Sequence, residues 1–284
     1  MALHYQVIRP SAALARHVQC YWVLEGEACP DPHILLPDGF VEIVFARGEG
    51  AVVVGQMCRP RTGPAQGRFR WLGARLRPES AHRFFAVPQT ELSDRITRLE
   101  DLWGPAARDW AEANGPDVEW ALYRQLRPRA SAPGVDRAVH LILASGGTVN
   151  MHGLAREAAM SGRNLERSFR ERVGLPPKTL ARVMRFQRTL WALEQSETSW
   201  ASVAAACGYY DQAHLVRDFR EFAGQTPSDY RRCAVEISQA AQGHRNPKFV
   251  GFLQDFTGQR DYAGFTSFKR VFWLAGGRNG KADS

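Results

Sequence analysis

Several familiar patterns are missing from this 284-residue sequence, and each absence argues against a class of protein. Its five cysteines include no CxxC pair, which argues against both a zinc module and a secreted disulfide framework. No stretch approaches the roughly 18 to 20 apolar residues of a membrane-spanning helix, and the N-terminus has no uninterrupted apolar core of signal-peptide length. We therefore expect a cytoplasmic protein with no membrane partner.

Motifs of common enzyme and metal sites are missing as well. The sequence has no GxSxG, no P-loop and no GxGxxG following a strand. The histidines show no ligand spacing such as HxH or HxxxH. None of Cys20, Cys29 and Cys58 lies in a motif that indicates a reactive thiol. We therefore predict that the protein is not an enzyme and has neither a cofactor nor a metal.

The charge balance points to an anionic partner. The composition is that of a soluble globular protein, with 44% hydrophobic and 23% charged residues and a net charge of +8. Lys and Arg against Asp and Glu give 16 − 15 = +1 for residues 1–133, 14 − 10 = +4 for 134–232, and 7 − 4 = +3 for 233–284. Residues 134–232 are therefore the best place to look for an anion-binding surface.

The chain divides into a strand-rich part and a helical part. Up to about residue 90, short apolar runs such as VQCYWVLEG and AVVVGQM are separated by Gly and Pro, with turns at Pro37-Asp38-Gly39 and near Gly48, which predicts strands. Helices are expected at Glu91–Leu99, Pro105–Ala113 and Val118–Leu126. The fold class is α+β with two domains, and the predicted divisions are 1–130 (β-rich with a helical end), 131–134 (linker), 135–232 (all-α) and 233–284 (a tail of unknown role).

The helical part contains an internal repeat. Leu165, Phe169, Gly174 and Pro177 recur exactly fifty positions later, whereas Ala155 recurs at forty-nine. In each copy a helix with small residues leads through a tight turn into a second helix, and one long helix joins the two copies. The sequence therefore predicts two helix–turn–helix units, the second with one extra residue in its turn.

The second helix of each unit has two distinct faces at spacings of three and four. Leu165, Phe169 and Val173 are expected to point inward, as are the equivalent Leu215, Phe219 and Phe222. The opposite faces carry mostly Arg, Gln and Glu, and Arg and Gln can bind base edges or phosphates. These candidate double-stranded-DNA contacts are Arg163, Glu166, Arg167, Arg170, Gln212, Ala213, Val216, Arg217 and Arg220.

Residues 135–232 resemble the AraC/XylS family of bacterial transcription regulators. The resemblance rests on LAREAAMSGRNLERSFRERVGLPPKTL, on Arg185-Phe186, and on GYYDQAHLVRDFREFAGQTPSDYRR. It implies a seven-helix domain whose helices starting at Arg163 and Gln212 enter successive major grooves, and it places seven of the nine candidate contacts at the family's DNA-facing positions. The other two, Arg170 and Arg220, stand where the family commonly has Lys, so the operator of a relative cannot be transferred.

Two reading helices on one chain have a geometric consequence. Placed about one helical turn of DNA apart, near 34 Å, they read two adjacent major-groove segments without a symmetric dimer. A direct-repeat or asymmetric site is therefore expected for one protomer.

The first ninety residues also resemble a sensory domain found on a subset of this family, through the segments PDG, VVG and LGARLRP. The resemblance implies effector binding or dimerisation and a cupin-type β-barrel. A small-molecule effector pocket on the strands would be lined by Trp22, His33, Glu42, Arg75 and Arg77. Arg75 and Arg77 lie two apart, and their shared face is expected to be the outer, solvated one.

Three functions remain open at this point. The first is a DNA-binding transcription regulator that responds to a ligand or partner, that contacts RNA polymerase if it activates, and that forms a homodimer through residues 1–130. The second is a helical domain that serves as a protein-interaction module without specific DNA binding. The third is a catalytic N-terminal domain of the kind fused to this helical domain in DNA repair.

Overall fold

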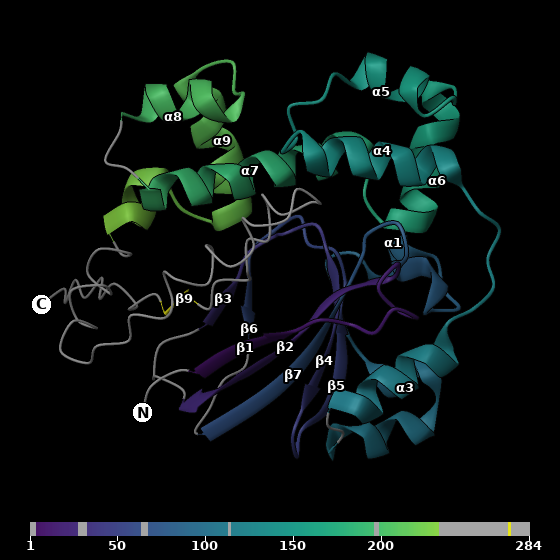
Figure 1. Ribbon diagram of the computed structural model, residues 1–284. Coiled ribbons are helices and arrows are strands. Elements are labelled where there is room, and N and C mark those ends of the chain that lie inside the picture. The colour runs from purple at the N-terminus through teal and green to yellow at the C-terminus, as the bar shows by residue number, and fades with distance from the viewer. Residues whose placement is uncertain are drawn as a thin grey trace, which may run out of the picture.

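The computed structural model describes residues 4–27, 33–63, 68–112, 115–195, 199–232 and 272–273. Its N-terminal part is built on a six-stranded antiparallel sheet in the order β1-β2-β7-β4-β5-β8 (Figure 1). The strands are β1 His4–Ile8, β2 Val18–Glu27, β4 Val41–Ala46, β5 Gly50–Val54, β7 Arg68–Leu76 and β8 Ile96–Arg98. The predicted β-rich N-terminal region is thereby confirmed, and the pairings leave β1 and β8 at the two edges of the sheet.

A second sheet has three short strands in the order β6-β3-β9. They are β3 His33–Leu35, β6 Arg61–Gly63 and β9 Phe272–Trp273. Through β9, a piece of the predicted tail pairs antiparallel with β3, so this part of the tail adds a strand to the N-terminal region. The rest of the predicted tail, 233–271 and 274–284, lies outside the described residues.

The two faces of the large sheet differ in what they bury. One face contributes Tyr21, Ile43 and Phe45 to an apolar core that also includes side chains of the following helical segments, among them Leu122. These segments are η1 Ala81–Arg83, α1 Gln89–Leu92, α2 Leu99–Trp103, η2 Pro105–Glu112 and α3 Gly115–Gln125. The other face carries a smaller aromatic cluster around Trp22 and Phe69, together with buried charged side chains described below.

The prediction of a helix at Glu91–Leu99 is wrong. Helix α1 ends at Leu92, and Ile96–Arg98 forms strand β8 along the edge of β5. The reason is Asp94, which takes a positive φ of 56°, donates its N–H to Gln56 O (2.8 Å) and accepts the Cys58 N–H on Oδ1 (2.7 Å). These long-range bonds, together with the β5 pairing, outweigh the local helical preference.

The C-terminal part is helical. Its elements are α4 Pro133–Ala144, α5 Met151–Glu157, α6 Gly162–Val173, α7 Pro177–Gln195, α8 Trp200–Cys207 and α9 Gln212–Ala223, followed by helical residues 227–232. Figure 1 shows α7 running between the α5/α6 pair and the α8/α9 pair. Phe169, Phe186 and Phe219 lie in one buried core that joins both pairs to α7. The predicted α+β architecture is thus present in both its parts.

Candidate nucleic-acid interface

Both candidate recognition helices have capping groups at their two ends. Ser161 begins α6, its hydroxyl accepting the Asn164 N–H at 3.3 Å, and Asp211 begins α9, its carboxylate accepting the His214 N–H at 2.7 Å. Gly174 and Gly224 end the two helices in the left-handed conformation, with φ of 94° and 73°. The chemistry of the caps therefore sets both ends of each candidate recognition helix.

The inward faces of the two helices are buried as predicted. In α6, Leu165, Phe169 and Val173 are at most 3% exposed. The equivalent α9 residues Leu215, Phe219 and Phe222 are at most 1% exposed. Since one face of each helix is buried in the core, only the opposite face is available to bind a partner.

The outer face of α6 is charged and exposed. Arg163, Glu166, Arg167 and Arg170 all lie in solvent. Glu166 accepts a hydrogen bond from Arg170 Nη2 at 3.0 Å, and Arg167 Nη2 donates to Asn164 Oδ1 at 2.8 Å. Exposed pairs of this kind contribute at most about 1 kcal/mol, so both arginines can exchange these partners for phosphate or base oxygens.

The outer face of α9 has fewer internal partners. Gln212, Ala213, Arg217 and Arg220 are exposed and Val216 is half-buried. Within the described part of the chain, the side chains of Arg217 and Arg220 make no hydrogen bond or ion pair, and neither does the side chain of Arg163 of α6. Three guanidinium groups therefore face solvent with their donors unused, although contact of any of these residues with DNA stays a prediction.

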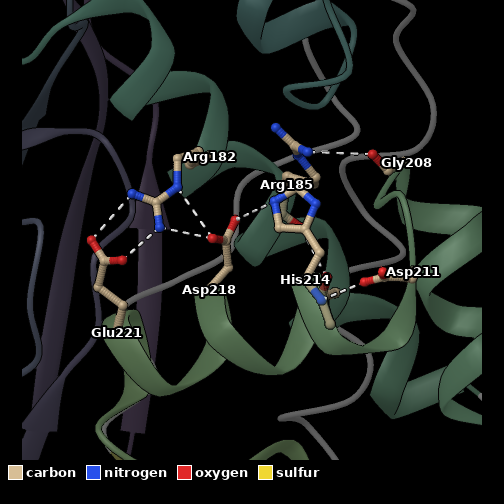
Figure 2. Close-up of polar contacts among 8 residues, drawn as sticks. Arg182, Arg185, Gly208, Asp211, His214, Asp218 and Glu221 are labelled. Atoms are coloured by element: carbon tan, nitrogen blue, oxygen red, sulfur yellow. Dashed lines mark hydrogen bonds and ion pairs between the residues drawn. The ribbon is translucent and has the colours of Figure 1, made fainter.

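Figure 2 shows how α9 is fixed to the long helix α7. Arg182 of α7 donates from Nη2 to Asp218 Oδ1 at 2.7 Å and from Nη1 to Glu221 Oε1 at 3.1 Å. The hydrogen bonds of Glu221 and Asp218 raise the pKa of Arg182, although burial opposes this. Asp218 is only 2% exposed, so its ion pair with Arg182 holds α9 at a fixed rotation and thereby sets the direction of its outer face.

The opposite ends of the recognition helices contact the N-terminal part. Ser93 Oγ donates to Gly174 O, at the end of α6, at 2.9 Å. At the end of α9, Pro60 lies 3.4 Å from the position that a Cβ on Gly224 would take. A 12-residue helix is about 18 Å long, so the capped N-terminal ends of both helices lie away from this contact.

The N-terminal domain contains a buried charged cluster at the centre of one sheet face. Arg75 is 0% exposed, and its Nη2 lies 2.7 Å from Asp38 Oδ2 and 2.9 Å from Glu42 Oε1. The guanidinium also lies over the Phe40 ring at 4.8 Å. The expectation that Arg75 faces solvent is therefore wrong, because two carboxylates distant in sequence compensate its charge inside the protein.

The predicted effector residues are brought together only in part. Glu42 of β4 is paired with Arg75 of β7. Trp22 of β2 is paired with Gly73, two residues before Arg75 on the same face, and its ring covers that glycine. Arg77 lies beyond the end of β7, and its Nε donates to Ala15 O at 3.0 Å. His33 belongs to β3, and its side chain lies outside the described residues.

Sequence reasoning missed two members of this face. Cys20 pairs with Arg75 across β2 and β7, and burial raises its pKa to about 11. Tyr5 stacks on Trp22 with ring centroids 6.5 Å apart, and burial raises its pKa too. The alternation within VQCYWVLEG places Cys20 with Trp22 on one face, but no sequence signal places that face beside Arg75.

Among the described residues, no group of three or more His, Cys, Asp or Glu could hold a metal ion. Within that same part of the chain, every helix is too short or too polar to cross a bilayer.

Comparison with known proteins finds relatives for the helical part of the chain. Residues 154–233 match a family described as a helix-turn-helix domain, and residues 6–98 match a domain of unknown function (DUF6597). An uncharacterized HTH-type transcriptional regulator of Haemophilus influenzae is 33% identical over 79 residues, which are 28% of this chain and 26% of that protein. The HTH-type transcriptional activator RhaS of Pectobacterium atrosepticum is 31% identical over 86 residues, 30% of this chain and 31% of the activator.

A solved structure is similar to about a third of this chain. It is a transcriptional regulator of Chromobacterium violaceum described as containing an AraC-type DNA-binding domain, with 27% identity, 35% of this chain and 90% of that chain covered, and a TM-score of 0.33. This chain matches only about a quarter to a third of the length of the curated relatives. Its C-terminal region is an AraC-type helix-turn-helix domain, as the sequence resemblance predicted.

Proposed function

We propose that this protein is a sequence-specific transcription regulator that binds double-stranded DNA through the outer faces of α6 and α9. One observation carries the proposal: two equivalent helices, fixed to a single core, each expose arginines on the face opposite that core. Such side chains suit phosphates and guanine edges, and two readers on one chain suit two successive major grooves. The site is then a direct repeat or asymmetric sequence.

The individual residues have distinct proposed roles. Arg163, Arg167 and Arg217 contact bases or phosphates, with Gln212 and Glu166 as secondary readers. Ala213 and Val216 present small apolar surface between them, suited to a thymine methyl group. Arg170 and Arg220 lie further along their helices and suit the phosphate backbone.

The test is a titration of a selected duplex with the parent protein and with Arg217→Ala. The variant is expected to lose about 1 to 3 kcal/mol on the preferred site alone if Arg217 binds a base. If it binds phosphate, it weakens all duplexes equally and reduces the slope of log K against log salt by about one. Arg137→Ala is the control, because Arg137 is an exposed arginine on α4, paired with Glu157 at 2.9 Å. Equal binding of Arg217→Ala and parent to every duplex would contradict the assignment.

The same titration separates the rival functions. A protein-interaction module would show weak binding with no sequence preference, so no preferred duplex would emerge. A catalytic N-terminal domain of the repair type needs a nucleophilic thiol, and burial works against this at the two described N-terminal cysteines by raising the pKa of Cys20 and of Cys58 to about 11. We therefore propose a regulator that is not an enzyme.

We further propose that the N-terminal domain, residues 1–130, responds to an effector at the sheet face that carries Trp22, Glu42 and Arg75. Because Arg75 is already paired with two carboxylates, an anionic ligand would have to displace one of them. A neutral or cationic small molecule fits this cluster better than the anion that Arg75 alone suggests. A thermal-shift screen of small amines, sugars and carboxylic acids tests this, with Glu42→Gln expected to lose the response to the bound class.

Several finer features of the proposal come from the family resemblance. They are a cupin-type closure of the N-terminal sheet, a seven-helix C-terminal domain at residues 135–232, and a homodimer through residues 1–130. The proposed linker at 131–134 comes instead from the Pro, Ser and Gly of the segment RPRASAPG. An activator would also contact RNA polymerase. We place the protein in the cytoplasm, where it has access to bacterial DNA.

A further inference from the structure

The two repeat units differ in the length of the turn before their recognition helices. The residue in the left-handed conformation is Ala159 in the first unit, with φ of 51°, and Gly208 in the second, with φ of 78°, forty-nine positions later. The helix caps Ser161 and Asp211 are fifty positions apart. The second turn therefore contains one residue that the first lacks.

The structure identifies the additional residue. Between the left-handed position and the cap, the first unit has only Met160, which packs against the helical core. The second unit has Tyr209 and Tyr210. Tyr209 is 6% exposed and occupies the core position, whereas Tyr210 is 93% exposed, the most exposed of the large hydrophobic side chains described. Tyr210 is thus the additional residue, and the core does not use it.

The backbone on both sides of Tyr210 is held by hydrogen bonds. Before it, Arg185 Nη1 donates to Gly208 O at 3.3 Å, and the same guanidinium lies 5.2 Å from the centroid of the Tyr209 ring. After it, Asp211 caps α9 (Figure 2). With the backbone held on both sides, the direction in which Tyr210 leaves the turn is set by the fold.

Tyr210 also stands next to the proposed reading face. It lies two residues before Gln212 and three before Ala213, at the end of α9 that points away from the N-terminal domain. A tyrosine here offers one hydroxyl donor for a phosphate oxygen and a flat ring for a deoxyribose. A phenolic hydroxyl donates a hydrogen bond without adding a positive charge, so its contact with a phosphate releases no counterion and does not steepen the salt dependence of binding.

We propose that the Tyr210 hydroxyl donates a hydrogen bond to a backbone phosphate at the edge of the groove that α9 enters. The contact fixes the register of α9 and has no equivalent at α6, so the two readers differ in how they are anchored. The proposal rests on the DNA-binding function proposed above and adds a positioning residue to it.

The test compares Tyr210→Phe and Tyr210→Ala with the parent on a duplex selected for the full chain. Loss of one hydrogen bond to a charged acceptor weakens binding about tenfold, so both variants are expected to lose this much. The salt dependence should stay at the parent value, and reselection should return the parent sequence. Tyr123→Ala is the matched control, since Tyr123 on α3 is 60% exposed and distant in sequence from both units.

Each other result overturns the proposal in a recognisable way. Parent-like affinity of Tyr210→Phe shows that the hydroxyl makes no contact, and an altered preference at the α9 segment shows that Tyr210 reads a base instead. Because the side chain is exposed, neither variant should change the melting temperature, which circular dichroism checks. If Arg217→Ala weakens binding but Tyr210→Ala does not, only this inference fails. If the parent protein selects no duplex, the proposed function itself fails.

Discussion

Arg182 of α7 holds the buried Asp218 of α9 at 2.7 Å, on the helix that carries the second candidate reading face. Replacing Arg182 with Met leaves the Asp218 carboxylate buried without its cation. Loss of one partner of a buried pair costs about 3 to 5 kcal/mol, and the lower value applies here because Arg182 is 24% exposed. Urea unfolding is expected to show a loss near 3 kcal/mol.

The control for this substitution is Arg232→Ala. Arg232 pairs with Asp229 at 2.8 Å, and both side chains are exposed, so its loss should cost less than about 1 kcal/mol. Equal costs for the two variants would mean that Arg182 contributes no more than a surface pair and does not anchor α9.

Gly39 connects the buried charged cluster to the helical domain. Its φ is +80°, and an added Cβ would lie 2.7 Å from Met184 Cε and 2.8 Å from Leu180 Cδ1, both on α7. Gly48 has nearly the same φ, +78°, with no atom within 4 Å of its would-be Cβ. Gly48→Ala should therefore cost only the left-handed strain, about 1 to 2 kcal/mol. Gly39→Ala should add about 1 kcal/mol of overpacking, the low end of the usual range, because the atoms that its Cβ meets are the ends of side chains that can shift.

The free energy of unfolding of both variants measures this difference. A Gly39→Ala cost no larger than that of Gly48→Ala would show that the turn at residues 37–39 moves away from α7 without penalty. In that case, the contact would not couple the N-terminal cluster to the helix that joins the two reading units.

His82 should make stability depend on pH. Burial, together with the positive charges of Arg172, Arg83 and Arg129, lowers its pKa to about 4, against an ordinary value of 6.5. As the pH falls, His82 therefore takes up a proton in the unfolded chain before it does so in the folded protein. Its contribution to the free energy of unfolding is fully present above pH 6.5 and decreases toward pH 4, by up to about 3 kcal/mol.

The measurement is the unfolding free energy at pH 7.5, 6, 5 and 4.5 for the parent, His82→Gln and His140→Gln. His82→Gln should flatten most of the decrease, while His17, whose pKa burial also lowers, keeps its own contribution. His140 is exposed and serves as the control. An unchanged slope in His82→Gln would contradict the assignment.

Two glycines should respond in opposite directions to alanine: Gly208, which ends α8, and Gly162, which begins α6. Gly208 has a φ of +78°, and a Cβ there would lie 2.5 Å from Thr148 Cγ2, so Gly208→Ala is expected to lower the melting temperature. Gly162, at the first position of α6, has no atom within 4 Å of its would-be Cβ, so Gly162→Ala should stabilise by up to about 1 kcal/mol. Shifts of the same sign would contradict the different roles of the two glycines.

Local patterns predicted the helical domain well. The period of three and four separates Leu165 and Phe169 from Arg163 and Arg167, because a helix that packs on a core must have one apolar face. The fifty-residue repeat then predicted the second unit from the first. The forty-nine-residue spacing of Ala155 indicated the extra turn residue, although not that it is Tyr210.

The N-terminal domain was predicted less completely, because its decisive interactions are long-range. The sequence pattern predicted Arg75 at the surface. Arg75 is buried instead because Asp38 and Glu42, 37 and 33 positions earlier in the chain, pair with its guanidinium. Likewise, Ile96–Arg98 becomes a strand only because the edge of β5 is available. Neither partner can be found from the alternation of apolar and polar residues in one segment.

The central claim is that one chain carries two DNA readers, and selection from a random duplex library with the full-length protein at physiological salt tests it most directly. The account predicts one bipartite motif whose two segments are about ten base pairs apart, without two-fold symmetry within the motif. Arg163→Ala should relax only the segment read by α6, and Arg217→Ala only the segment read by α9. A single enriched segment that responds to both variants, or no enrichment at all, would contradict the account.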